Sequence, residues 1–214
     1  MATDITSTLL GKDRWIKDLG LRVLRHPATA KIAGAMRYDL RMWDDIVRSR
    51  TVTEWLRALQ PEAMDALEIS GKRWQDFGFG SYRSLAYPAF DICQDRVNER
   101  YDLVLADHVF EHIRYPHRAA QNVAAMLKPG GYFLMCTPFL VKVHPSPIDC
   151  YRWTEDGMRY FLEESGFEDV RTGSWGNKAC VKSLLRIWMP RGWSSLKNDP
   201  EFPVVVWALA RRHA

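Results

Sequence analysis

The stretch Tyr101–Phe139, YDLVLADHVFEHIRYPHRAAQNVAAMLKPGGYFLMCTPF, decides the fold. It begins with a short apolar run, 102–106, which has the length of a buried strand. Apolar residues at helical spacing follow over 119–127, and a Pro-Gly-Gly run ends that helix. The run 132–136 is again apolar, so the stretch predicts one βαβ unit with parallel strands. Because ligands bind beyond the carboxyl ends of such strands, we look for a site in the residues just after them.

Short apolar runs on both sides of this unit predict the rest of a sheet. Turn-forming and acidic residues separate these runs. Thr154 is a suitable N-cap for a further helix, whose first turn contains acidic residues. Strands that alternate with helices are typical of a doubly wound, mostly parallel α/β sheet. The seven predicted strands are 66–69, 82–86, 90–93, 102–106, 132–136, 168–170 and 204–210.

The first sixty residues predict helices that cover the sheet or form a lid over its ligand edge. Apolar residues recur at helical spacing around Trp15 and again around Trp43. Thr51 offers an N-cap for a third helix, which a proline ends. We therefore expect an N-terminal helical segment over 1–60 and a main domain over 61–214.

Bulk properties limit the classes of protein to which the chain can belong. Its 214 residues suit one domain with an extension. The four cysteines form no C-x-x-C pair, which indicates reduced thiols in a cytoplasmic protein. No apolar run reaches the roughly 20 residues of a membrane span. Both ends are basic and the centre is acidic, but no basic run is interleaved with aromatic residues as in a nucleic-acid site.

Taken in order from 64 to 211, these elements resemble the class I S-adenosylmethionine-dependent methyltransferases. The resemblance implies a Rossmann-like fold with a mostly parallel, seven-stranded sheet and S-adenosylmethionine as the cofactor. Its most specific motif is a helix end and Gly-Gly turn that enters the fifth strand. The motifs that carry the match are ALEISG at 66–71, YDLVL at 101–105, FEH at 110–112, MLKPGG at 126–131 and the segment from WTE at 153–155 to ESGF at 164–167.

The cofactor joins a positive sulfonium, an amino-acid end, a ribose and an adenine. Glu68, at the end of the first strand, is placed to balance the positive end, and the backbone amides near Ser70 to receive the carboxylate. The family usually places an acid that accepts from the adenine amino group where Asp95 stands. The predicted cofactor-binding residues are Glu68, Ile69, Ser70, Gly71, Asp91, Asp95, Ala106, Asp107 and His108, of which the last three form the floor under the methionine moiety.

The turn after the first strand departs from the family pattern. The family has three glycines where this chain has Gly71 alone, and the side chains of Lys72 and Trp74 are expected to crowd the cofactor. So few residues follow Glu68 before the fourth strand that the first crossover is expected to be very short or a loop. No acid ends the second strand, and Asp91 is the nearest substitute for holding the ribose. These departures keep open a non-catalytic scaffold or partner-binding protein.

The loop after the fifth strand is expected to lie over the methyl group. Methyl transfer depends chiefly on positioning, and a base helps when the acceptor is a hydroxyl. We expect His144 or Asp149 to be this base, and Arg152 to bind a substrate carboxylate or phosphate. An Arg152–Asp149 pair that only orders the loop is the alternative. The predicted catalytic residues are His144, Asp149 and His112, and the predicted substrate-binding residues are Tyr151, Arg152 and Trp153.

Residues 108–112, HVFEH, also match H-x-x-E-H, a zinc-peptidase pattern. On a helix, His108 and His112 would share a face, with Glu111 as a base. Pro116 follows closely and a buried strand precedes, so a long helix is not expected here. We therefore predict no metal site, and a zinc hydrolase remains the alternative from another class.

The sequence therefore predicts a S-adenosylmethionine-dependent methyltransferase that acts on an oxygen or nitrogen atom of a small molecule, such as a sugar or a secondary metabolite. Its predicted partners are the cofactor and this acceptor, without nucleic acid and without a transmembrane segment. The sequence leaves the choice between a monomer and a homodimer open.

Overall fold

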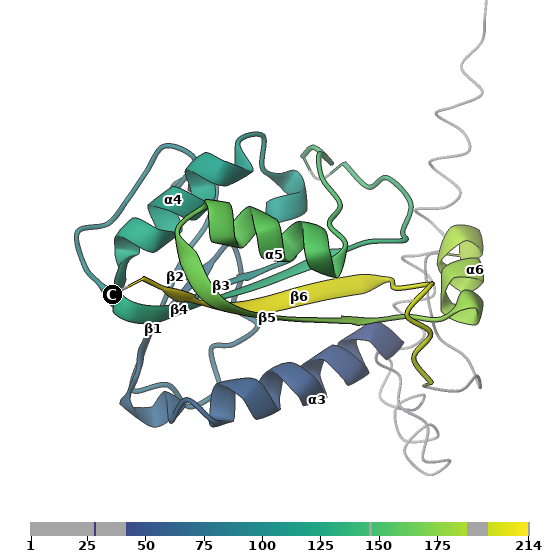
Figure 1. Cartoon of the computed structure of the whole chain (residues 1–214), viewed down its shortest axis with the longest axis horizontal. Helices are drawn as coiled ribbons and strands as arrows, with labels where there is room; N and C mark the ends of the chain where they lie inside the picture. Colours follow the sequence, from purple (N-terminus) through teal and green to yellow (C-terminus); the bar gives the residue numbers. More distant parts are fainter. Residues whose placement is uncertain (1–27, 29–41, 146, 188–196, 214) are drawn as a thin grey trace, which may run out of the picture.

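A six-stranded sheet forms the centre of the computed structural model, which describes residues 28, 42–145, 147–187 and 197–213 (Figure 1). The strand order is β2-β1-β3-β4-β6-β5. The first four strands in this order pair in parallel, and β6 runs antiparallel to both of its neighbours. The strands are β1 (Asp65–Ile69), β2 (Ser81–Leu85), β3 (Tyr101–Asp107), β4 (Leu127–Pro138), β5 (Phe167–Trp175) and β6 (Val205–Arg212).

Helices cover both faces of this sheet. In Figure 1, α4 and α5 lie on one face and α3 on the other, while α6 lies at the edge where the parallel strands end. This layering is that of a Rossmann-like α/β fold, so the predicted fold class is confirmed. The helices are α3 (Trp43–Arg57), α4 (Pro116–Met126), α5 (Glu155–Glu164) and α6 (Lys178–Ile187), with short 3-10 turns η1 (Pro61–Ala63) and η2 (Phe110–His112).

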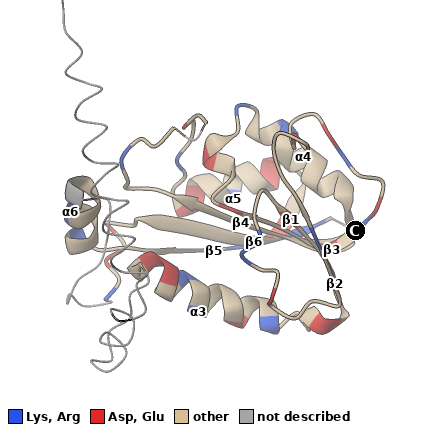
Figure 2. Ribbon diagram, turned by 180° about the vertical axis from the view of Figure 1, so that it is seen from behind, with Lys and Arg blue, Asp and Glu red and all other residues tan. Residues whose placement is uncertain are grey.

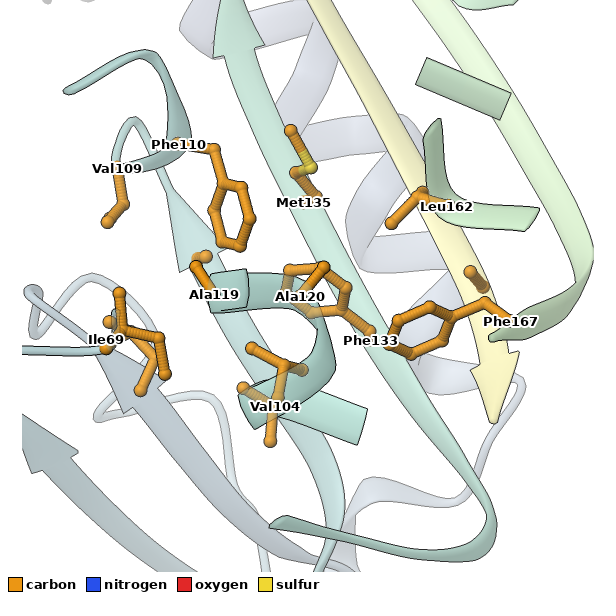
Figure 3. Packing of buried hydrophobic residues seen from close by; sticks show 14 of the residues in the cluster. Ile69, Val104, Val109, Phe110, Ala119, Ala120, Phe133, Met135, Leu162 and Phe167 are labelled. Atoms are coloured by element: carbon orange, nitrogen blue, oxygen red, sulfur yellow. The ribbon is translucent and has the colours of Figure 1, made fainter. Parts of the chain in front are cut away.

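The sheet separates two apolar cores because successive side chains of a strand point to opposite faces. Along β3, Val104 and Ala106 pack beneath α4 and α5, whereas Leu103 and Leu105 pack against α3 and α6. All four residues are fully buried. Figure 3 shows the first of these cores, in which Val104 lies beside Ala119 and Ala120 of α4. Burial on both faces explains why the strand reads as a continuous apolar run.

The segment 90–93, predicted as a strand, is instead part of a loop with two turns, so the described residues form six strands rather than seven. Two carboxylates stabilise the second turn. Asp91 Oδ1 accepts from the amide of Cys93 at 2.9 Å, and Asp95 Oδ2 accepts from the amide of Asp91 at 2.7 Å. Asp side chains that bond to nearby amides favour turns over strand ladders. The apolar residues of this segment still point into the core.

The N-terminal segment 1–60 was expected to contain separate helices, and Thr51 was expected to begin the third. Over the described residues 42–60, the second and third of these helices are instead one continuous helix, α3, which passes through Thr51 without a break. Val52 is fully buried against the sheet, and this burial outweighs the local capping signal. Within 42–60, the segment packs on one face of the sheet (Figure 1). The apolar stripe around Trp15 lies outside the described residues.

The connections between the parallel strands agree better with the sequence. A loop without a helix joins β1 to β2, as the short first crossover requires. The Gly-Gly turn lies inside β4, where Leu127 pairs with Tyr101 but Tyr132 pairs with Leu103, so the intervening residues bulge. Gly130 takes a φ of +74° in this bulge, which favours glycine. Among the described residues, no helix has the length and apolar character that crossing a membrane requires.

Candidate active site

A cavity of about 900 Å³ lies at the carboxyl ends of β1, β2 and β3. Its walls are mostly apolar, with a few polar groups that converge on it. The exposed rings of Tyr87 and Tyr115 contribute to its wall. A cavity of this size and character, at this edge of an α/β sheet, suits a ligand of cofactor size. Of the predicted site residues, Ile69, Ser70, Asp91, His108 and His112 line it.

Glu68 does not line this cavity and is instead enclosed beneath the loop after β1. Its two carboxylate oxygens accept from the amides of Arg73 and Trp74, each at 3.0 Å. The hydroxyl of Tyr82 donates to the same carboxylate at 2.6 Å. Burial, together with this bond to Glu68, raises the pKa of Tyr82. Glu68 therefore positions the loop that borders the cavity.

The single-glycine turn avoids the crowding that its sequence suggests. Ser70 takes a φ of +57°, the left-handed conformation that a glycine usually supplies. At Gly71, a Cβ atom would lie 2.3 Å from Oε1 of Glu68, so glycine is required beside the enclosed carboxylate. Lys72 is exposed, and the ring of Trp74 is buried in the core beside α3. Neither side chain lines the cavity, so the expectation that they crowd the cofactor is wrong.

The two acids after β2 differ in their positions. Asp91 lines the cavity, where it was expected as a substitute partner for the ribose. Its carboxylate also accepts from the side-chain amide of Gln94 at 2.7 Å. Asp95 lies outside the cavity wall, and its carboxylate faces the turn that it stabilises. The Asp95 carboxylate therefore does not face an adenine bound in this cavity.

The floor residues after β3 are held from the opposite face of the sheet by α3. Arg48, which is only 1% exposed, lies 3.3 Å from Asp107 Oδ1 and donates to Nε2 of His108 at 2.5 Å. Arg73 Nε lies 3.1 Å from the other oxygen of Asp107. Figure 2 shows that acidic residues also gather at the end of α3 that faces α6. Because the two arginines hold the carboxylate of Asp107, this residue and the fully buried Ala106 lie behind the cavity wall and support it.

A second, smaller cavity of about 90 Å³ shares His108 with the first. It lies between α3, α6 and the loop after β4. Asp44 on α3 and His144 on the loop are its other ionisable residues. Burial and the neighbouring Asp45 raise the pKa of Asp44, and its Oδ1 has no hydrogen-bond partner. The remaining walls are apolar and come from Met42, Pro138, Val141, Leu184 and Val204.

The loop after β4 is ordered by an ion pair between Asp149 and Arg152. Arg152 Nη2 donates to Asp149 Oδ2 at 2.6 Å, and Nη1 bonds to Oδ1. Asp149 also accepts from the amide of His144 at 2.8 Å. Tyr151 stacks on Trp153, whose ring packs into the core beside α5. The three residues predicted to bind the substrate, Tyr151, Arg152 and Trp153, therefore line neither cavity.

The H-x-x-E-H segment does not form the helix that a zinc peptidase needs. Residues 110–112 form only the 3-10 turn η2. His108 has a φ of +59° and its Nε2 accepts from Arg48, so the two histidines share no helical face. His112 lines the large cavity, while its ring packs edge-on against His144 at 5.2 Å between centroids. The zinc hydrolase reading of this pattern is therefore wrong.

Comparison with known proteins identifies the family. The model of a methyltransferase domain matches residues 47–172, more than half of the chain. The chain belongs to the methyltransferase family. It is a S-adenosylmethionine-dependent methyltransferase with S-adenosylmethionine as its cofactor. The non-catalytic alternative is therefore not needed.

Solved methyltransferases have the same fold. A S-adenosylmethionine-dependent enzyme from Archaeoglobus fulgidus has a TM-score of 0.50 at 13% identity, over 79% of this chain and 98% of its own. A possible histamine N-methyltransferase from Thermotoga maritima has a TM-score of 0.51 at 13% identity, over 78% and 94%. Phosphoethanolamine N-methyltransferase 2 from Haemonchus contortus has a TM-score of 0.50 at 13% identity, over 77% and 53%. No curated protein matches the sequence.

The large cavity of this methyltransferase fits its cofactor. Ile69 and Ser70 line it at the end of β1, and Asp91 lines it from the loop after β2, where its contact with a ribose stays a prediction. The wide apolar wall suits the adenine and methionine carbons. Sequence reasoning missed Arg48 and Asp44, which lie four residues apart on α3. The sequence does contain a signal for them: both residues are charged, yet they lie close to the apolar Trp43 and Ile46 in the same helix.

Proposed function

We propose that this methyltransferase transfers its methyl group to an oxygen or nitrogen atom of a small molecule in the cytoplasm. The shared position of His108 carries this proposal, since it lines both the large cavity and the small one. A cofactor in the large cavity and an acceptor in the small cavity would meet beside this residue. The small cavity has room only for the reacting end of an acceptor.

The residues around the small cavity suit a nucleophile that bears a hydrogen atom. Asp44 has a buried oxygen without a hydrogen-bond partner, which would accept from an acceptor amine or hydroxyl. His144 faces the same cavity, and we assign it the contact with the acceptor on the opposite wall. Asp149 is a positioning residue, because it accepts from the amide of His144 and is itself held by Arg152.

When bound, S-adenosylmethionine supplies an electrophilic methyl group on a positive sulfonium. The chain's own residues contribute orientation, which is the main source of rate in such a transfer. The Arg48–Asp107 pair holds the end of β3, and through it the wall between the cavities. The apolar walls of the small cavity keep water away from the reacting atoms.

Filling each cavity separately would test this assignment. Phe in place of Ala86, in the large cavity, should abolish both binding of S-adenosylhomocysteine and methyl transfer. Phe in place of Val141, in the small cavity, should leave that binding within about twofold and remove transfer to small alcohols and amines. Ala63→Phe, at an exposed position, is the matched control. Undiminished transfer by Val141→Phe would show that the acceptor binds elsewhere.

A further inference from the structure

Glu111, His112 and His144 each bring one potential ligand atom into a common cluster, in which these atoms lie within 4.8 Å of one another. The first two residues belong to η2, and the third belongs to the loop after β4. We propose that these three residues, the Glu111 site, bind a divalent transition-metal ion such as Zn²⁺. This set differs from the H-x-x-E-H pattern, because His144 takes part and His108 does not.

The carboxylate of Glu111 provides the first argument. Glu111 is fully buried, and neither of its oxygens has a hydrogen-bond partner. Two ring nitrogens approach it without forming a hydrogen bond, with His108 Nδ1 at 3.4 Å and His112 Nε2 at 3.6 Å from Oε1. A buried carboxylate without hydrogen bonds is costly unless a cation compensates it. A divalent ion between Glu111 and the two imidazoles would supply that compensation.

The tautomer of His112 provides the second argument. Its Nδ1 lies 2.5 Å from the carbonyl oxygen of Ile148. Because a carbonyl can only accept, Nδ1 carries the proton, and in the neutral ring Nε2 presents its lone pair. That lone pair and Oε1 of Glu111 are then two electron donors 3.6 Å apart. Metal-bound histidines commonly donate their other N–H to a backbone carbonyl in this way.

His144 has the same kind of support behind its ring. Its Nδ1 lies 3.2 Å from the carbonyl oxygen of Lys142 and 3.3 Å from Oδ2 of Asp149. Both are acceptors, so they favour the proton on Nδ1 and leave Nε2 as the ligating nitrogen. Arg152 Nη2 also lies 3.4 Å from Nδ1, but its closer bond is to Asp149 at 2.6 Å. A carboxylate behind a histidine is a recurrent outer partner of metal ligands.

Two imidazoles and one carboxylate favour Zn²⁺ and similar transition metals over Mg²⁺ or Ca²⁺, which prefer oxygen ligands. Three protein ligands also leave a coordination position for another molecule. Since His144 lines the small cavity, an acceptor hydroxyl is the group that could take this position and lose its proton more readily. This role rests on the proposed function, whereas the binding of the ion does not.

The test is metal binding to the full chain after removal of bound metal by a chelator. Titration with Zn²⁺ by calorimetry, and with Co²⁺ by absorption spectroscopy, should give one ion per chain. His144→Ala and Glu111→Gln should each weaken the affinity by more than about a hundredfold, and Asp149→Asn by about tenfold. His117→Ala, on α4, and Cys150→Ser, which removes the exposed thiol after Asp149, should bind as the unaltered protein does.

Several results would overturn the proposal: no saturable binding, binding that persists in His144→Ala, or binding that Cys150→Ser removes. Circular dichroism checks the fold of each variant. If Glu111→Gln does not fold, His144→Ala decides, because His144 lies on a partly exposed loop. Binding is measured without cofactor or acceptor. Intact binding without any methyl transfer would therefore contradict the proposed function alone.

Discussion

Arg48 of α3 and Asp107 at the end of β3 form an ion pair across 3.3 Å, although their side chains are only 1% and 4% exposed. The pair connects a helix on one face of the sheet with the strand end that supports the large cavity. Asp107 also faces Arg73 from the loop after β1. Three segments that are distant in sequence therefore converge on one buried carboxylate.

Breaking this pair should be costly because it leaves a buried charge less compensated. We expect Arg48→Met to lower the free energy of unfolding by about 3 kcal/mol, measured by urea denaturation. Arg50→Ala, at an exposed position of the same helix, should cost under about 0.5 kcal/mol. Adding Asp107→Asn to Arg48→Met should recover part of the loss, since it removes the uncompensated charge. Equal losses in the two single Arg variants would contradict the prediction.

The Asp149–Arg152 pair makes the stability of the protein depend on acid pH. Bonds from Arg152 lower the pKa of Asp149 to about 2 in the folded chain. A carboxyl with a lowered pKa stabilises the fold above its unfolded pKa, and this contribution is lost as the pH falls through the folded value. Asp149→Asn should therefore lower the free energy of unfolding by about 2 kcal/mol at pH 7 and hardly at all at pH 2. A difference that does not depend on pH would argue against this pair as the cause.

Much of the fold could be predicted because its signals are local or periodic. The apolar runs of β1, β3 and β4 and the Thr154 cap each appear in a few neighbouring residues. The errors arose where a distant contact outweighed a local preference. Thr51 reads as a cap, but burial of Val52 beneath the sheet keeps α3 continuous.

The site was harder to predict because its geometry depends on the direction in which each side chain points near the end of its strand. Glu68 and Asp95 stand at the expected positions in the sequence, yet both carboxylates face backbone amides rather than the cavity. Arg48 reaches the site from across the sheet, and no spacing in the sequence could show that contact. Ser70, directly after β1, and Asp91, in the loop after β2, both line the cavity, and their contacts with the cofactor stay predictions.

The four thiols should differ in reactivity. Cys150 is exposed, while Cys93, Cys136 and Cys180 are buried. Burial raises the pKa of each of the buried thiols, that of Cys180 to about 12. Because the thiolate is the reactive form, iodoacetamide at pH 8 should modify Cys150 rapidly and the others slowly. Mass spectrometry should show one early alkylation, which Cys150→Ser removes; a second early site would show that a buried thiol is accessible.

The enclosed carboxylate of Glu68 should control cofactor binding without touching the cofactor. Glu68→Ala removes three hydrogen bonds, two of which hold the loop after β1. We expect it to lower the free energy of unfolding by about 3 kcal/mol or more. It should also weaken binding of S-adenosylhomocysteine, measured by calorimetry, by about tenfold.

Tyr82→Phe is the matched control for Glu68→Ala, because it removes one of the three bonds and leaves both loop amides paired. It should cost about 1 kcal/mol and leave the affinity nearly unchanged. Gly71→Ala provides the converse test, since its Cβ atom would displace the Glu68 carboxylate while every donor remains. If Glu68 acts by positioning the loop, Gly71→Ala should weaken binding as Glu68→Ala does. If Gly71→Ala binds normally, the loop does not transmit the effect, and Glu68 must act on the cofactor by its charge.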